Sequence, residues 1–342
     1  MRQKLALFLV MVMCAALTSG CIEKKAASAE EVIVLEFGHF QNPGHALYIA
    51  PEEFKELVEE QSGGRVIINI YPASQLGSAR EMMEQVSMGA LDITMADASD
   101  WGSTFDIPEL GVFNLPFLSK DLDSQSEIIR TILPDVVPEM LEGSRLHLLM
   151  TYSNGIRQPL TKTKPITSLE DIKGMKMRTP ETKLYVDLWN ALGASTVTSA
   201  WSEAYTLLQQ GIADAVEADD VGLVSQNLQE VGKYMSNTGH LGQAYMVLIN
   251  EEKWNSIPAD LQEIIMECAT KNQEKQLSDR KQLGEEAMVV IEDAGVEIND
   301  ITDEERQRMR EACQSIYDEY EEKYGLGELI KRMEAVNVAK TQ

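Results

Sequence analysis

From Val32 onward, short apolar runs typical of strands alternate with segments whose apolar residues have helical spacing. Segments 32–39, 65–72 and 91–96 are short apolar runs typical of strands. Segments 51–64 and 78–89 carry apolar residues at helical spacing and end in glycine, a common helix stop. The order is strand, helix, strand, helix, strand, which predicts an α/β architecture with a largely parallel sheet.

A second series of the same kind follows an irregular stretch. We expect strands at 145–153 and 175–178 and helices at 167–174, 179–194 and 201–211. Two capping boxes support the helix starts, one of Ser78 with Glu81 and one of Thr167 with Glu170. Two α/β units in tandem predict two lobes.

The last third of the chain is helical over an unusual length. One helix is expected from Ala259 to about Gly295, with Gly284 as a possible weak point, and another at 303–325. Cys268 and Cys313 lie in these helices. They either pair in an oxidising compartment or stay as buried free thiols, and the second reading is the simpler one.

The first residues have the layout of a secretory signal. Arg2 and Lys4 precede an uncharged apolar run, and small residues precede Cys21 in the string "LTSGC". The run is shorter than the roughly 20 residues that span a bilayer. The string resembles a lipobox, with Thr18 where leucine is usual, so we expect export and lipidation of Cys21, with ordinary signal cleavage nearby as the alternative.

The chain is strongly acidic, with 55 Asp and Glu against 30 Lys and Arg and a formal net charge of -25. Such a surface repels nucleic acid and anionic membrane. An anionic ligand must therefore be held by a local concentration of donors, which raises the interest of individual arginines.

Sequence motifs for catalysis or metal binding are missing. The chain has no GxSxG, HExxH, Walker loop, GxGxxG or CxxC, and its four histidines are not spaced as metal or triad partners. The sequence therefore predicts neither an enzyme nor a metal site, and no cofactor.

Two arginines are placed for recognition. Arg178 ends a strand, and Thr179 and Pro180 have the pattern of a helix cap and first residue. A guanidinium at such a junction meets the crevice of an α/β sheet and suits a carboxylate. Arg157 follows another strand and could approach the same crevice, but from these patterns alone a surface charge is the simpler reading of either arginine.

Several blocks resemble a known family. They include "EEQSGGRVIINIYPASQLGSAREMMEQVSMGALDI", "NGIRQPLTKTKPITSLEDIKGMKMRTPE" and "LGASTVTSAWSEAYTLLQQGIADAVE". Together they resemble the solute-binding proteins of tripartite ATP-independent periplasmic (TRAP) transporters, DctP type. The resemblance implies a two-lobed periplasmic-binding-protein-like fold, each lobe a mixed, mostly parallel sheet flanked by helices, with a long helix bridging the lobes.

The resemblance also implies a function. Such proteins are extracytoplasmic receptors that close on a small organic acid and deliver it to two TRAP membrane subunits for ion-coupled uptake. Arg178 then corresponds to the arginine that forms a two-pronged salt bridge with the carboxylate, Arg157 to a second basic contact, and Trp201 to an aromatic wall. Asp97, His39 and Asn42 are further candidates for polar contacts.

One position departs from the family pattern. Where many relatives have an acidic residue, asparagine and proline, this chain reads "VEADD", which places Ala218 at the asparagine. A donor to the carboxylate is therefore missing, and another group must replace it or the ligand must be held differently.

The expected division of the chain follows from the elements and the resemblance. It comprises a signal at 1–20, a tether at 21–31, a first lobe of 32–153 with 241–283, a second lobe of 154–240 with 284–329, and a C-terminal tail at 330–342. We expect the protein outside the cytoplasm, periplasmic or on the outer face of the cell membrane, held by a lipid on Cys21.

Two other functions compete with a transport receptor. One is a sensor lipoprotein that presents a carboxylate ligand to a signalling receptor. The other is an exported enzyme acting on an organic acid, which the missing nucleophile and metal motifs disfavour.

Overall fold

The computed structural model describes residues 32–339. The expected signal at 1–20, the tether at 21–31 and the lipidation of Cys21 lie outside the described residues. All elements below belong to one compact unit that begins at Ile33. Within the described range, no helix combines the length and apolarity needed to cross a membrane.

The first sheet begins with three parallel strands, as the sequence predicts. β1 (Ile33–Gly38) pairs with both β2 (Val66–Tyr71) and β3 (Ile93–Asp97). The connecting helices are α2 (Ala46–Gln61) and α3 (Ala79–Met88). The carboxyl ends of the three strands therefore point to one edge of the sheet, where connecting loops can build a site.

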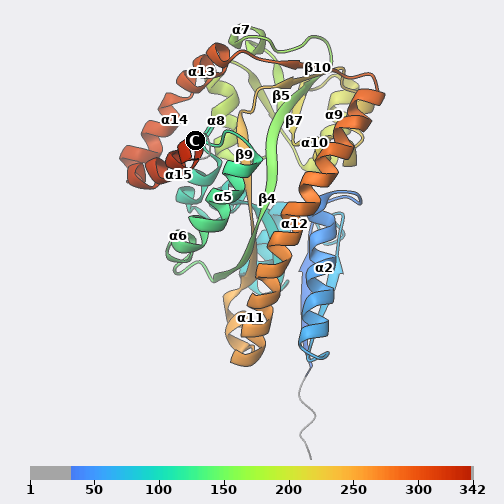
Figure 1. Ribbon diagram of the computed structural model, residues 1–342, viewed down its shortest axis with the longest axis vertical. Coiled ribbons are helices and arrows are strands. Elements are labelled where there is room, and N and C mark those ends of the chain that lie inside the picture. The colour runs from blue at the N-terminus through green and yellow to red at the C-terminus, as the bar shows by residue number, and fades with distance from the viewer. Residues whose placement is uncertain (1–31, 340–342) are drawn as a thin grey trace, which may run out of the picture. The chain divides into compact units, whose positions relative to one another are not determined.

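Two long antiparallel strands complete this sheet and continue beyond it (Figure 1). β9 (Leu241–Asn250) pairs with β3, and the 16-residue β4 (Leu146–Thr161) pairs with β9. The last residues of β4 also pair with β7 (Ala215–Ala218) of the second sheet. The strand order is β2-β1-β3-β9-β4-β7-β5-β6, so β4 is shared by both sheets.

The second sheet is again mainly parallel. β5 (Lys176–Thr179) lies between β7 and β6 (Ser195–Thr198), parallel to both. β8 (Tyr234–Asn237) pairs with β4 and with β10 (Glu297–Asp300). The helices of this half are α7 (Leu169–Ile172), α8 (Lys183–Ala191), α9 (Ala204–Gln210) and α10 (Asp220–Ser225), with short 3-10 turns at Trp201–Glu203 and Leu228–Glu230.

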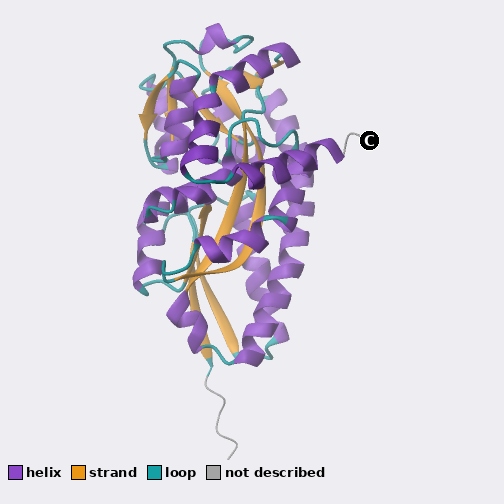
Figure 2. Cartoon of the chain, turned by 90° about the vertical axis from the view of Figure 1, so that its left-hand side faces the viewer, coloured by secondary structure: helices purple, strands orange, loops and turns teal. Residues whose placement is uncertain are grey.

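The remaining helices cover the sheets, and Figure 2 shows the strands between layers of helix. The segment after β3 forms α4 (Ala98–Phe105), a 3-10 helix (Pro108–Asn114), α5 (Leu122–Thr131) and α6 (Leu133–Met140). After β9 come α11 (Glu251–Ser256) and α12 (Ala259–Asp293), and the chain ends with α13 (Asp303–Ala312), α14 (Gln314–Asp318), a π-turn (Glu319–Lys323) and α15 (Gly327–Ala339).

The long helix α12 links the two halves. It packs against α2 of the first lobe and against α10 of the second, and it runs along β4 (Figure 1). The helix is unbroken at Gly284, where a Cβ would lie 2.6 Å from Nη1 of Arg280 and 3.1 Å from a carboxylate oxygen of Asp220. Gly284 is therefore not a weak point; it makes room for a buried arginine.

Apolar clusters fill each half and the space between them. One cluster joins α2, the first sheet and the start of α12, and another joins β7, α9 and the end of α12. The largest contains Trp101 of α4, Leu188 of α8 and Ile330 and Met333 of α15. Residues expected to form a C-terminal tail thus lie in α15 and bury two side chains. The two-lobed α/β fold with a bridging helix is confirmed.

Several element boundaries differ from the prediction. α8 starts at Lys183 and not at Thr179, because Thr179 is paired in β5 and the residue before a proline disfavours helical geometry. β4 extends to Thr161, so Arg157 lies inside a strand and not after one. α2 starts five residues before Pro51, with the His45 ring as its cap, and the box at α7 consists of Ser168 and Asp171.

The predicted capping box of α3 is present. Ser78 Oγ accepts a hydrogen bond from the Glu81 amide, and the Glu81 carboxylate accepts one from the Ser78 amide at 2.7 Å. We expect Ser78→Ala to lower the free energy of unfolding by about 0.5–2 kcal/mol in urea denaturation, because a cap is lost. Ser87→Ala, inside the same helix, serves as the control and should not destabilise; equal losses in both variants would contradict the capping role.

Candidate functional site

A cavity of about 210 Å³ lies where the two sheets meet. Its walls come from residues 40–104 on one side, from residues 178–222 on the other, and from β4 and β9 at the base. The volume is below the roughly 300–1,000 Å³ of drug-sized sites. The cavity therefore suits a small metabolite enclosed between two lobes.

Arg178 is a buried cation in this cavity without an ionic partner. Its side chain is 2% exposed, and Nε donates to Ser199 Oγ at 3.1 Å while Nη2 donates to the Ser199 carbonyl oxygen. The guanidinium carbon lies 5.4 Å from the centre of the Trp201 ring. No carboxylate in the described part of the chain lies within ion-pair distance of it.

The charge on Arg178 is maintained in spite of its burial. Burial lowers the pKa of Arg178 to about 10, with Glu217 and Asp100 opposing the shift and Arg157 adding to it. The group remains a cation at neutral pH. A buried charge without an ion-pair partner is costly, and here only hydrogen bonds to Ser199 and the more distant charges of Glu217 and Asp100 offset that cost.

Arg157 lines the same cavity but already has a partner. Its Nε pairs with a carboxylate oxygen of the fully buried Glu217, and Nη2 donates to the Glu217 carbonyl oxygen. His240 Nε2 lies 3.3 Å from the same carboxylate oxygen. Burial acts to lower the pKa of Arg157, but the charge of Glu217 outweighs it and raises the pKa above its usual value. Arg157 is thus largely neutralised.

The other predicted residues divide into two groups. Trp201 and Ala218 line the cavity together with the two arginines. Asp97, His39 and Asn42 do not line it. The structure therefore brings together Arg157, Arg178, Trp201 and Ala218, and leaves the three candidates from the first lobe outside.

Asp97 and Asn42 have structural partners. The carboxylate of Asp97 caps α4 by accepting from the Ser99 amide at 3.0 Å, and it also accepts from Asn114 Nδ2 at 3.0 Å. Burial raises the pKa of Asp97 to about 8, and the nearby Asp100 adds to the shift. Asn42 donates to Gln226 Oε1 across the cleft, and Gln226 donates to the Trp201 carbonyl oxygen at 3.2 Å.

His39 is buried without a hydrogen-bond partner. Both ring nitrogens lack one among the described residues, and the ring packs edge-on against Tyr48, with centroids 5.5 Å apart. Burial, and then the neighbouring His45, lower the pKa of His39 to about 3. The ring is therefore neutral at physiological pH.

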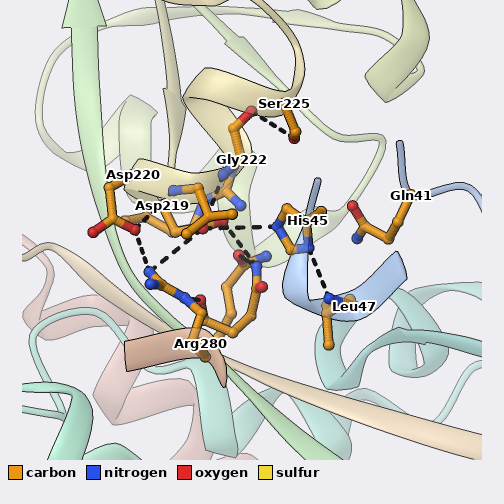
Figure 3. Close-up of polar contacts among 12 residues, drawn as sticks. Gln41, His45, Leu47, Asp219, Asp220, Gly222, Ser225 and Arg280 are labelled. Atoms are coloured by element: carbon orange, nitrogen blue, oxygen red, sulfur yellow. Dashed lines mark hydrogen bonds and ion pairs between the residues drawn. The ribbon is translucent and has the colours of Figure 1, made fainter. Parts of the chain in front are cut away.

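Residues not identified from the sequence form a polar network (Figure 3), several members of which, including His45, Asn154 and Asp219, line the cavity. Asp219, the cap of α10, accepts from the Gly222 amide at 3.0 Å and from Asn154 Nδ2 at 2.9 Å. His45 Nε2 lies 3.7 Å from Asp219 Oδ1, and Arg280 Nη2 lies 3.5 Å from the same oxygen. Burial opposes ionisation, but the contacts with His45 and Arg280 hold the pKa of Asp219 below its usual value.

This network joins four elements. Its residues come from the start of α2, the middle of β4, the cap of α10 and the interior of α12. Arg280 Nε also donates to the Asn154 carbonyl oxygen at 2.5 Å. The only available sequence signal was the helix-cap pattern of Asp219 in "DDVGLV", because the side chains that contact Asp219 from other elements lie 65 or more residues before it or 61 residues after it. Within the described residues, no cluster of His, Cys, Asp or Glu could hold a metal ion, and Cys268 and Cys313 are buried and free.

Substitutions of Arg157 and Arg178 should have different effects on stability. Arg157→Met leaves Glu217 buried without its main partner, so we expect a loss of about 3–5 kcal/mol in the free energy of unfolding. Arg178→Met removes an unpaired buried charge, so we expect the stability of the ligand-free protein to stay equal or rise. Urea denaturation after refolding from denaturant, which removes carried-over ligand, measures both. A similar large loss in both variants would contradict this assignment.

His39 should make the fold sensitive to acid. Its pKa is about 3 in the folded protein against an ordinary 6.5, so between these values the unfolded chain binds a proton that the folded chain does not. Stability therefore falls with decreasing pH, by up to about 1.4 kcal/mol per pH unit from this group. We expect His39→Gln to lose less stability than the parent protein between pH 7 and pH 5 in urea denaturation. Equal losses would show that His39 is protonated in the folded state.

Comparisons with known proteins agree with this architecture. A profile of the DctP family, described as bacterial extracellular solute-binding protein, family 7, matches residues 37–323. The C4-dicarboxylate-binding periplasmic protein DctP of Rhodobacter capsulatus is 30% identical over 298 residues, which cover 86% of this chain and 88% of that protein.

Two solved structures are similar in fold along most of the chain. A TRAP periplasmic solute-binding protein from Chromohalobacter salexigens with bound D-glucuronate has a TM-score of 0.83 and 25% identity, covering 88% of this chain and 99% of that one. Another from Desulfovibrio salexigens with bound orotic acid has a TM-score of 0.82 and 27% identity, covering 90% and 99%. The chain therefore belongs to the bacterial extracellular solute-binding protein family 7, the DctP-type solute-binding proteins of TRAP transporters.

Proposed function

We propose that this protein is an extracytoplasmic receptor that binds a small organic acid in the cavity between its lobes. The observation that carries the proposal is Arg178, which is 2% exposed, charged at neutral pH and without an ion pair among the described residues. A ligand carboxylate supplies the missing anion. The three relatives above support this ligand class, because their printed ligands, C4-dicarboxylate, D-glucuronate and orotic acid, all carry a carboxylate.

The surroundings of Arg178 hold its guanidinium ready for the ligand. Ser199 accepts hydrogen bonds from Nε and Nη2 of Arg178, and the Trp201 ring lies beside the guanidinium. The guanidinium is therefore ordered before the ligand arrives. A planar guanidinium can then form two parallel hydrogen bonds with a carboxylate. Each charged hydrogen bond is worth roughly 1.5–3 kcal/mol in a buried site, against about 0–1 kcal/mol for an exposed pair.

Ligand binding and closure of the lobes form one equilibrium. The division we propose is a first lobe of 32–153 with 241–283 and a second of 154–240 with 284–329. Contacts that cross the cleft, such as Thr182 Oγ1 with Asp100 and Asn42 with Gln226, require the lobes to be close together. A carboxylate on Arg178 favours the closed state because its affinity for that state is higher.

The receptor delivers its ligand unchanged to two TRAP membrane subunits, which take it up by ion coupling. A lipid on Cys21 holds the folded body at the outer face of the cell membrane, through the tether at 21–31. The family assignment supports the membrane partners, and the signal pattern of the first residues supports export.

Removal of the Arg178 charge should abolish tight binding. We expect Arg178→Ala to weaken the affinity for the best-bound acid of a panel (D-glucuronate, D-gluconate, succinate and orotate) by at least about 100-fold, because two charged hydrogen bonds are lost. Isothermal titration calorimetry on refolded, ligand-free protein measures the affinity.

The matched control is Arg308→Ala. Arg308 bonds to Glu170 and Glu305 at the surface, both at 2.6 Å, and does not line the cavity. This variant should bind as the parent does. An affinity of Arg178→Ala within about twofold of the parent value would refute the role of Arg178 as the carboxylate ligand.

A further inference from the structure

The arginines that line the cavity differ in whether they have a carboxylate partner. Of the three lining arginines, Arg157 pairs with Glu217, and Arg80 pairs with Glu84 at 3.2 Å on the surface. Arg178 is then the one lining arginine of the described chain without a carboxylate partner. The wall also contains the carboxylates of Asp100, Glu181 and Asp219. The cavity therefore has charge to hold one ligand carboxylate and none left for a second.

Asp100 offers a hydrogen-bond acceptor on the side of the first lobe. It lies half-buried in α4, and one of its oxygens accepts from Thr182 Oγ1 across the cleft. No hydrogen bond from a described residue reaches the other oxygen. Burial raises the pKa of Asp100, with Thr182, Arg157 and Arg178 opposing the shift. Because it has no such bond, the second oxygen can accept a hydrogen bond from a ligand.

Asn154 offers a second acceptor at the base of the cavity. Its side chain is 2% exposed, and Oδ1 is buried without a partner in the described structure. The amide orientation is determined by its neighbours, because Nδ2 donates to the Asp219 carboxylate at 2.9 Å and to Gln243 Oε1 at 2.8 Å. A flipped amide would place an oxygen against two acceptors. Oδ1 is therefore a free acceptor, and an unpaired one costs about 1–3 kcal/mol.

Neutral polar groups in the cavity wall can adapt to a polar ligand. Gln41 and Tyr245 line the cavity, are almost fully buried and share a long hydrogen bond of 3.4 Å. An amide and a phenol both donate and accept. This part of the wall accommodates hydroxyl groups without requiring a charge.

We infer that the site selects a monocarboxylate whose body carries several hydroxyl groups, of the sugar-acid type, over a dicarboxylate. This inference rests on the proposed function. Arg178 takes the carboxylate, and hydroxyls donate to Asp100 and Asn154. A second carboxylate has no proton to donate at neutral pH, leaves both acceptors unpaired and adds a negative charge beside Asp100.

The test is a ranking of probes on refolded, ligand-free protein by calorimetry. The probes are D-glucuronate and D-gluconate as hydroxylated acids, succinate as dicarboxylate, orotate as an acid without aliphatic hydroxyls, glutamine as an amino acid, and glucose as a neutral polyol. We expect a hydroxylated acid to bind at least about tenfold more tightly than each of the others.

Asp100→Asn tests the residue that carries the discrimination. The substitution keeps the size and removes the charge, so we expect the ratio of affinities for hydroxylated acid over succinate to fall at least about tenfold. Asp106→Asn, at the exposed end of the same helix, is the matched control and should leave the ratio unchanged. Thermal melting of both variants verifies that they are folded. The ranking of probes on the parent protein tests the inference even if a variant does not fold.

The outcomes separate this inference from the proposed function. Succinate, orotate or glutamine binding as tightly as every hydroxylated acid would overturn the inference and leave the carboxylate receptor standing. An unchanged ratio in folded Asp100→Asn would also overturn it. Binding of glucose with no binding of any acid would overturn the proposed function itself.

Discussion

An unpaired buried charge is the constraint on which the site depends. Arg178 is held by Ser199 and Trp201, neither of which neutralises it, while every other arginine at the base of the cavity or behind it has a carboxylate partner. This difference separates a structural ion pair from a cation that is free to bind an anion. The Arg157 and Glu217 pair fixes the wall, whereas no neighbouring carboxylate cancels the electrostatic potential of Arg178. The fold thus keeps one desolvated cation at the expense of its own stability.

The shared elements explain how such a cavity is formed from two lobes. β4 belongs to both sheets, and α12 packs on helices of both lobes, so the two walls are connected along one strand and one helix. Asp219, in the cavity wall, gathers contacts from α2, β4, α10 and α12. The polar side chains at the base are consequently oriented by residues of four different elements.

The local features of this fold could be predicted from sequence, and the long-range ones could not. The strands β1, β2 and β3, the cap at Ser78 and the unusual length of α12 follow from periodicity and short motifs. The pattern at Thr179 and Pro180 predicts a helix start, but Thr179 pairs in β5 and α8 begins only at Lys183. Arg178 could be placed at a strand end from its local pattern and was singled out by the family resemblance, but the pairing of Arg157 with Glu217, 60 residues away, has no local signature. Asp100 and Asn154 depend on such distant partners too.

One irregularity of β4 has a mechanical consequence. Its register shifts between Ser153 and Gly155, where Gly155 adopts a φ of 115° and the Arg280 guanidinium of α12 packs against the space that a Cβ would fill. The point at which the strand can bend is therefore the point at which the helix is fastened. A change in the bend of the strand at Gly155 would therefore displace α12 as well, because the Arg280 guanidinium joins the two elements there. The strand at the base of the cavity and the long helix of Figure 1 are in this way mechanically one part.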